Sequence, residues 1–150
     1  MTPIHVPAGE GNKLNIFGNI DNIRIHSRDT GGALAVIESN NRPGEGPPPH
    51  VHSREDETFH VLEGEYEFNV GGKTIRAQTG TTIFAPRGIP HVFRCTSQTP
   101  GKLMVVITPG GFEGFFEEIG AMSPQQQQEN IPRCMELARK YGAEILPPPH

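Results

Sequence analysis

The feature that most constrains the fold is a series of short stretches in which apolar and polar residues alternate. In residues 65–70 the sequence is EYEFNV, so that every second residue is apolar. Successive side chains of a β-strand point to opposite faces, and this alternation therefore predicts a strand with one buried face. Glycine and proline number 33 (18 plus 15) and lie between such stretches. Repeated short strands and turns favour an all-β barrel or sandwich.

The same pattern recurs at short intervals through the first two thirds of the chain. The predicted strands are residues 20–26, 33–39, 50–52, 57–62, 65–70, 74–77, 81–84, 91–95 and 103–108. A length of 150 residues suits one domain that can bury a core without disulfides. Residues 1–110 are therefore expected to form a β-barrel.

The pattern changes near residue 111, where aromatic residues recur at helical spacing. Phe112, Phe115, Phe116 and Ile119 indicate an amphipathic helix, which we interpret as core packing, with Gly120 as its C-cap. Residues 123–126, SPQQ, predict a capped helix start, and a last helix is expected over about residues 132–141. Residues 111–150 are thus predicted to be a helical extension packed on the same domain, with an extended tail.

Charge and composition exclude several classes of partner. The formal net charge is -4 and the lysines and arginines are scattered, so no basic stripe exists for nucleic acid. Neither a signal-peptide pattern nor an apolar stretch of membrane-spanning length is found, and a cytoplasmic protein without membrane contact is the default expectation. Cys95 and Cys134 lie far apart in sequence and are predicted to be free thiols.

Three histidines and a glutamate are the candidate metal ligands. His50 and His52 are separated by one residue, so on a strand both imidazoles project from the same face. Glu57 opens the next predicted strand after a polar turn that could return its carboxylate to the histidines. His91 follows the rigid segment PRGIP at the start of a later strand. These four side chains could converge on one ion.

Two neighbouring residues are alternatives to this set. Asp56 could replace Glu57 as the ligand, because polar loops can bulge by one residue. His60 lies on the opposite strand face from Phe59 and Val61, and we expect it outside the metal pocket.

The spacing of these residues resembles the two motifs of the cupin superfamily. Residues 44–64 are similar to G-x5-H-x-H-x4-E-x6-G, with every spacing met, and residues 80–95 are similar to G-x5-P-x-G-x2-H-x3-N. The single departure is Cys95, which stands where the second motif has asparagine. The resemblance implies a double-stranded β-helix, a jelly-roll-like barrel, and a homodimer.

The resemblance also implies that one divalent metal ion is held by His50, His52, Glu57 and His91. Three imidazoles and a carboxylate, without thiolate, suit iron, manganese, nickel, cobalt or zinc. On an octahedral ion these four ligands would leave two open positions for water, dioxygen or a substrate.

Within the superfamily, the segments DETFHVLEGEYEF, TPGGFEGFFEEIG and KYGAEILPP look most like quercetinase-like (flavonol dioxygenase) proteins. This resemblance implies an oxygen-dependent dioxygenase that acts on an enolic aromatic small molecule, with Glu57 as the catalytic base. The residues expected to line the substrate pocket are Phe59, Phe84, Phe93 and Cys95. For Cys95, a small buried core residue is an equal alternative. The alternative functions are a non-catalytic module that binds metal or a small molecule, and a metal-dependent isomerase or decarboxylase.

Overall fold

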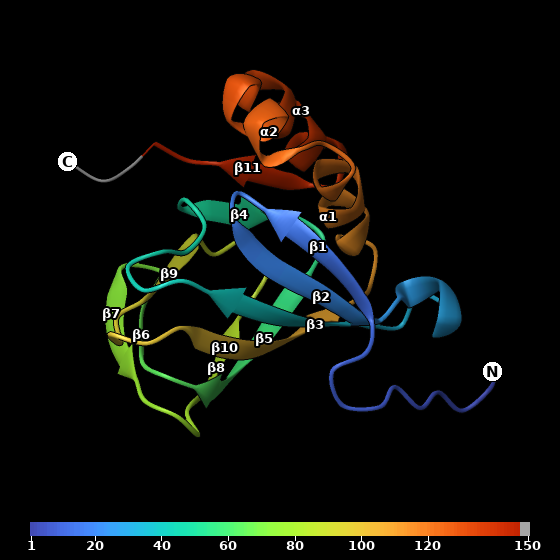
Figure 1. Ribbon diagram of the computed structural model, residues 1–150, viewed down its shortest axis with the longest axis horizontal. Helices are drawn as coiled ribbons and strands as arrows, with labels where there is room; N and C mark the ends of the chain where they lie inside the picture. Colours follow the sequence, from blue (N-terminus) through green and yellow to red (C-terminus); the bar gives the residue numbers. More distant parts are fainter. Residues whose placement is uncertain (148–150) are drawn as a thin grey trace.

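Two antiparallel β-sheets form the body of the protein in a computed structural model that describes residues 1–147 (Figure 1). The first sheet contains, in spatial order, β1 (Asn12–Ile16), β2 (Asn19–Ile25), β3 (Ala35–Asn41), β10 (Gly101–Thr108), β5 (Asp56–Glu63) and β8 (Thr82–Ala85). The second contains β11 (Ala143–Ile145), β4 (His50–His52), β9 (His91–Cys95), β6 (Tyr66–Val70) and β7 (Lys73–Ala77). This arrangement is the predicted double-stranded β-helix.

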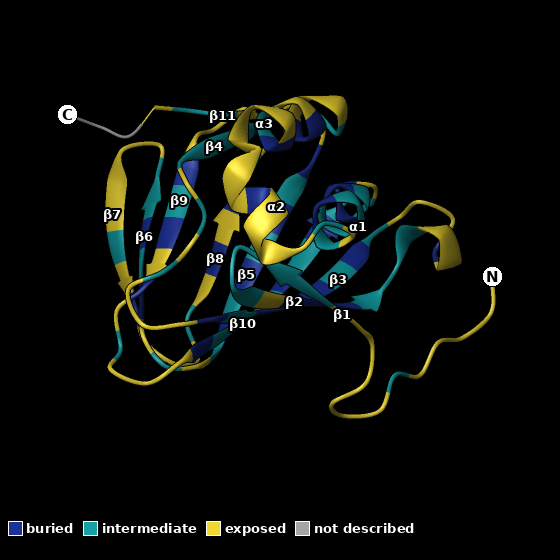
Figure 2. Ribbon diagram, turned by 45° about the horizontal axis from the view of Figure 1, so that its top comes forward, coloured by how far each residue is buried: buried dark blue, intermediate teal, exposed yellow. Residues whose placement is uncertain are grey.

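The core lies between the two sheets, as the alternation of the sequence requires. Along β5, Glu57, Phe59 and Val61 are buried and alternate with partly exposed residues. Along β10, the buried residues are Gly101, Leu103, Val105 and Ile107. Figure 2 shows this burial inside the barrel, while the edge strand β7 is largely exposed. Removing the apolar faces from water drives the two sheets together.

Two motif glycines make sharp turns that bracket the strands of the site. Gly64 has a φ angle of 79° at the end of β5, and Gly88 has a φ angle of 78° just before β9. Residues with a Cβ atom rarely adopt such positive values, so these positions favour glycine. The turns fix where β5 ends and where β9 begins.

Three helices form most of the C-terminal extension: α1 (Glu113–Gly120), α2 (Pro124–Glu129) and α3 (Ile131–Lys140). The predicted capping box is confirmed. The Ser123 hydroxyl accepts a hydrogen bond from the backbone amide of Gln126, and the side-chain oxygen of Gln126 accepts one from the backbone amide of Ser123. The prediction that Gly120 caps α1 is wrong, because Gly120 is its last helical residue. A Cβ atom there would lie 2.9 Å from the Leu14 side chain, so glycine allows α1 to approach β1 closely.

Two strands and one short helix were not anticipated from the sequence. They are β1, β11 and the 3-10 helix η1 (Ser27–Asp29). Strand β11 pairs with β4, so part of the extension joins the barrel's own sheet, and the helices lie at that end of the molecule (Figure 1). Residues 148–150 of the predicted extended tail lie outside the described chain. None of the described helices combines the length and apolar character needed to cross a bilayer.

Candidate metal centre

Three neighbouring strands bring the four predicted ligands together. His50 and His52 lie on β4, His91 is the direct cross-strand partner of His50 on β9, and Glu57 reaches them from β5 of the opposite sheet. One ligand atom from each residue lies within 4.8 Å of the others. The sheets therefore assemble the cluster that the sequence spacing predicts.

The outer nitrogens of two histidine rings are held by backbone carbonyls. His50 Nδ1 lies 2.8 Å from the Pro48 carbonyl oxygen, and His91 Nδ1 lies 3.3 Å from that of Ile89. A carbonyl oxygen only accepts hydrogen bonds, so Nδ1 carries the proton in each ring. The Nε2 lone pairs of His50 and His91 are then free to bind an ion.

The inner atoms of the cluster fit a divalent cation. Within residues 1–147, the buried atom His91 Nε2 has no hydrogen-bond partner. Glu57 Oε1 lies 2.5 Å from His52 Nε2, and Glu57 Oε2 lies 3.9 Å from His91 Nε2. Buried polar atoms without partners are costly, and a metal ion that takes their lone pairs removes that cost. Three nitrogen donors and one oxygen donor suit a first-row divalent metal.

Burial and mutual charge set the protonation of the four side chains. Burial, strengthened by the neighbouring His91, lowers the pKa of His50 to about 4. Burial alone would lower the pKa of His52, but the carboxylates of Glu57 and Glu55 outweigh it and raise this pKa to about 9. Burial would likewise raise the pKa of Glu57, but His52 and the other two rings bring it down to about 2. Glu57 is therefore ionised at neutral pH.

The two alternatives weighed from the sequence lie outside the cluster. Both carboxylate oxygens of Asp56 bind Arg87: Oδ1 accepts from the backbone amide at 2.8 Å, and Oδ2 accepts from the guanidinium at 3.1 Å. His60 points to the outer face of β5, where its Nδ1 lies 2.7 Å from the hydroxyl of Thr82. Glu57, and not Asp56, is the carboxylate that meets the three histidines.

The four residues predicted to line the substrate pocket do not lie together in the structure. Phe59 is buried, and its ring centre lies 5.8 Å from that of His91; Phe93 packs 5.6 Å from Phe59. The prediction for Phe84 is wrong, because its side chain is 57% exposed on the outer face of β8. Ala85, not Phe84, is the cross-strand partner of Glu57, so Phe84 points away from the site.

Cys95 is a core residue at the far end of β9. It is fully buried, it pairs across the sheet with Tyr66, and its sulfur lies 3.4 Å from the Ser97 hydroxyl. It lies four residue steps along the strand from His91, which is about 13 Å. Both Cys95 and Cys134 are free, as predicted, and both are buried.

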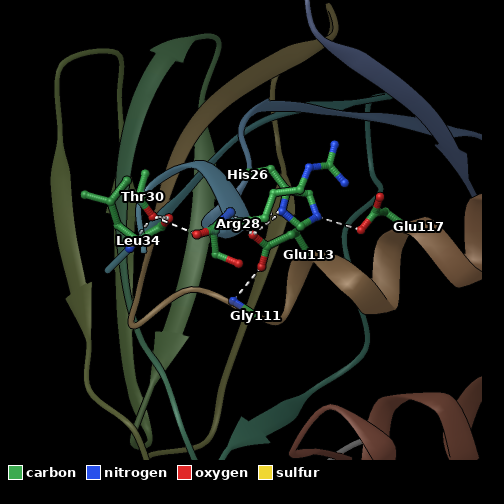
Figure 3. Close-up of polar contacts among 8 residues, drawn as sticks. His26, Arg28, Thr30, Leu34, Gly111, Glu113 and Glu117 are labelled. Carbon is green, nitrogen blue, oxygen red and sulfur yellow. Dashed lines mark hydrogen bonds and ion pairs between the residues drawn. The ribbon is translucent and has the colours of Figure 1, made fainter. Parts of the chain in front are cut away.

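Phe112 is an aromatic neighbour of the site that the sequence pattern assigned only to helix packing. Its ring meets that of His52 edge to face, with centroids 4.5 Å apart. The next residue, Glu113, is fully buried and accepts from the amides of Ser27 and Gly111 at 2.6 and 2.5 Å (Figure 3). His26 contacts Glu117 one turn further on, at 2.8 Å (Figure 3). These contacts fasten the start of α1, and therefore Phe112, beside the metal ligands.

Comparison with known proteins agrees with this geometry. Residues 40–107 match the model of the cupin domain. The chain is 30% identical over 118 residues to the quercetin 2,3-dioxygenase of Bacillus subtilis, an alignment that covers 79% of this chain and 35% of that protein. The chain spans 35%, 50% and 52% of the lengths of the curated relatives it matches.

Solved structures share the barrel. KdgF from Halomonas superposes with a TM-score of 0.68 at 19% identity, covering 75% of this chain and 99% of that one. The polyketide cyclase RemF from Streptomyces resistomycificus gives a TM-score of 0.55 at 25% identity, covering 72% and 79%. With its two motifs, its fold and these matches, residues 40–107 of the chain form a cupin domain, and the proteins similar to the chain include a quercetinase.

Proposed function

We propose that this chain is a metal-dependent dioxygenase that acts on an enolic aromatic small molecule of the flavonol type. The observation that carries the proposal is the cluster of three imidazoles and one carboxylate bordered by the aromatic rings of Phe59 and Phe112. A divalent ion bound there would act as a Lewis acid toward a substrate oxygen and support chemistry with dioxygen. The quercetin 2,3-dioxygenase among the relatives supports the same class of reaction.

In this proposal Glu57 binds the ion and also accepts the enolic proton of the substrate. Its carboxylate is ionised at neutral pH, and its two oxygens face different histidines, so one can serve the ion while the other takes the proton. His50 is the one member of the cluster that is partly exposed, which supports a substrate approach from its side.

The interior favours a neutral aromatic substrate over a small carboxylate. Among residues 1–147, the buried side chains include the acids Asp21, Glu55 and Glu57 but no lysine or arginine. A carboxylate substrate would find no buried lysine or arginine to orient it beside the ion, whereas an aromatic ring can pack against phenylalanine. This argues for the dioxygenase over a decarboxylase of small acids.

Oxygen uptake by the metal-loaded protein tests the proposal. Iron-, manganese- and nickel-loaded protein is mixed with flavonols and related enolic aromatics in an oxygen electrode. We expect oxygen uptake with at least one metal. Glu57→Gln should slow it by about 100-fold or more per bound metal, since loss of a general base costs 10²–10⁴-fold. His91→Ala should lose most of its metal, whereas His60→Ala, on the outer face, should behave as wild type.

The other outcomes separate the alternative functions. Conversion of substrate without oxygen use would contradict the dioxygenase and indicate an isomerase or decarboxylase. A shift in melting temperature on adding the same aromatics, without turnover with any metal, would instead indicate a binding module.

A further inference from the structure

The outer nitrogens of the three histidine ligands are supported in two different ways. Those of His50 and His91 face neutral backbone carbonyls. His52 Nδ1 instead faces a carboxylate oxygen, Glu55 Oε2, at 3.3 Å. Neither of these two atoms makes a hydrogen bond elsewhere in residues 1–147. One ligand of the cluster is therefore backed by a negative charge and the other two are not.

Glu55 is buried as deeply as the ligands themselves. Its side chain is 4% exposed, and that of His52 is 1% exposed. The loop that carries Glu55 is fastened by the C-terminal extension, since both the amide and the hydroxyl of Ser53 donate to the Gly142 carbonyl oxygen, at 2.8 and 2.9 Å. The chain thus fixes the carboxylate on the inner side of the loop.

The balance of charges explains how the carboxylate of Glu55 can be buried beside His52. An isolated buried carboxylate is strongly destabilising unless an opposite charge or a metal compensates it. Glu55 and Glu57 together bring two negative charges to His52, and no lysine or arginine is buried in the described chain. A divalent cation at the cluster offsets both charges.

We propose that Glu55 is a positioning residue of the metal centre, whose carboxylate accepts the Nδ1 proton of His52 and so directs the Nε2 lone pair of that ring at the ion. The two atoms lie 3.3 Å apart, close enough for an ion pair between the carboxylate and the ring. The negative charge makes His52 the strongest nitrogen donor of the three. Glu55 does not touch the ion, and Asp56 beside it serves Arg87 instead.

The test compares two substitutions that each remove one carboxylate from adjacent positions. Glu55→Gln keeps the size of the side chain and loses its charge, and Asp56→Asn is the matched control. Affinity for Zn²⁺ and Co²⁺ is measured by competition with a chelator. We expect Glu55→Gln to weaken metal binding by about 10–100-fold, as loss of such supporting carboxylates does elsewhere, and Asp56→Asn to stay within about twofold of wild type. Equal affinities for Glu55→Gln and wild type would overturn the proposal.

A second measurement uses the wild-type protein, so the proposal stays testable if Glu55→Gln fails to fold. In zinc-loaded protein with ¹⁵N-labelled histidine, NMR should show His52 bound through Nε2, with an Nδ1 proton further downfield than those of His50 and His91. A His52 bound through Nδ1, or three equivalent Nδ1 protons, would contradict the proposal. The inference rests on the proposed metal centre and not on the reaction: absence of zinc binding by the wild type would instead reject the metal centre itself.

Discussion

At the scale of single residues, the four-residue cluster pairs a protonated histidine with an ionised glutamate. The pKa of His52 is raised to about 9 and that of Glu57 is lowered to about 2, so at neutral pH these side chains form a buried ion pair. A metal ion must displace the proton from His52 Nε2 before it can take that lone pair. A proton and a metal ion would therefore compete for the same nitrogen atom of His52.

A second buried acid, Asp21, makes stability depend on pH. Asp21 is 8% exposed on β2; burial raises its pKa from 3.8 to about 6, although a hydrogen bond with Ser39 opposes the shift. Because the folded-state pKa lies above the unfolded one, the stabilising contribution is complete below pH 3.8 and is lost as the pH rises through about 6.

We predict that Asp21→Asn becomes stabilising, relative to wild type, as the pH rises from 4 to 7. The amide keeps a hydrogen-bonding group near Ser39 but never ionises, so it avoids the cost of a buried carboxylate. Two pKa units correspond to a change of up to about 3 kcal/mol in the difference between the two free energies of unfolding. Urea unfolding at several pH values measures it. Asp29→Asn, on the exposed helix η1, is the control, and a pH-independent difference for Asp21→Asn would contradict the prediction.

At the scale of elements, the sequence predicts a helix or strand correctly where contacts within that element determine its structure. The alternation around Glu57 and Phe59 and the Ser123 capping box depend on strand geometry and on hydrogen bonds within one helix turn. Such predictions fail where packing between distant elements determines which way a side chain points or where a helix ends. Phe84 was assigned to the wrong face because the phase of β8 is set by its pairing with β5. The sequence around Gly120 predicts a C-cap, because it does not show that Leu14 of β1 packs against this glycine.

Short strands also cannot be predicted from the sequence when pairing with neighbouring strands supplies most of their stabilisation. Strand β11 has three residues, AEI, too few for their alternation to indicate a strand, yet it pairs with the strand that carries His50 and His52. Glu55 and Phe112 belong to the same class, since nothing in the adjacent sequence shows that they meet His52. Their contacts depend on how the C-terminal extension folds back onto the barrel.

Gln127 joins α2 to the barrel, and we predict that Gln127→Ala destabilises the protein by about 2–4 kcal/mol. Its fully buried amide accepts from Phe17 N at 2.7 Å and donates to the carbonyls of Asn15, Ile119 and Met122 at 2.8, 3.0 and 3.1 Å. Alanine removes all four hydrogen bonds, although the Ile119 carbonyl keeps the one that it accepts from the Met122 amide. Each buried group that is left without a partner costs about 1–3 kcal/mol. Chemical denaturation measures the loss. The neighbouring Gln128→Ala is exposed and should change stability by less than about 0.5 kcal/mol; equal effects would refute the assigned role.

At the scale of the whole molecule, the site depends on both ends of the chain. Strand β4 lies between β9 and β11, so the C-terminal extension completes the sheet that carries the three histidines. Glu57 comes from the other sheet, whose far edge is formed by the N-terminal strands β1 and β2. The homodimer implied by the family resemblance stays a prediction; the exposed Phe84 on edge strand β8 is a surface aromatic that such pairing could cover.

Because the ligands are divided between the two sheets, a bound ion should clamp the barrel as a whole. A ligand that binds only the folded state at 100 times its Kd stabilises it by about 2.7 kcal/mol. For a chain of this size that raises the melting temperature by about 5–10 °C. We therefore expect zinc or nickel to raise the melting temperature by this amount in calorimetry, and a chelator to reverse it. Glu57→Gln weakens the only ligand from the six-stranded sheet and should lose most of the increase, whereas His60→Ala on the outer face should keep it. An equal increase in Glu57→Gln and wild type would show that the ion does not link the two sheets through this carboxylate.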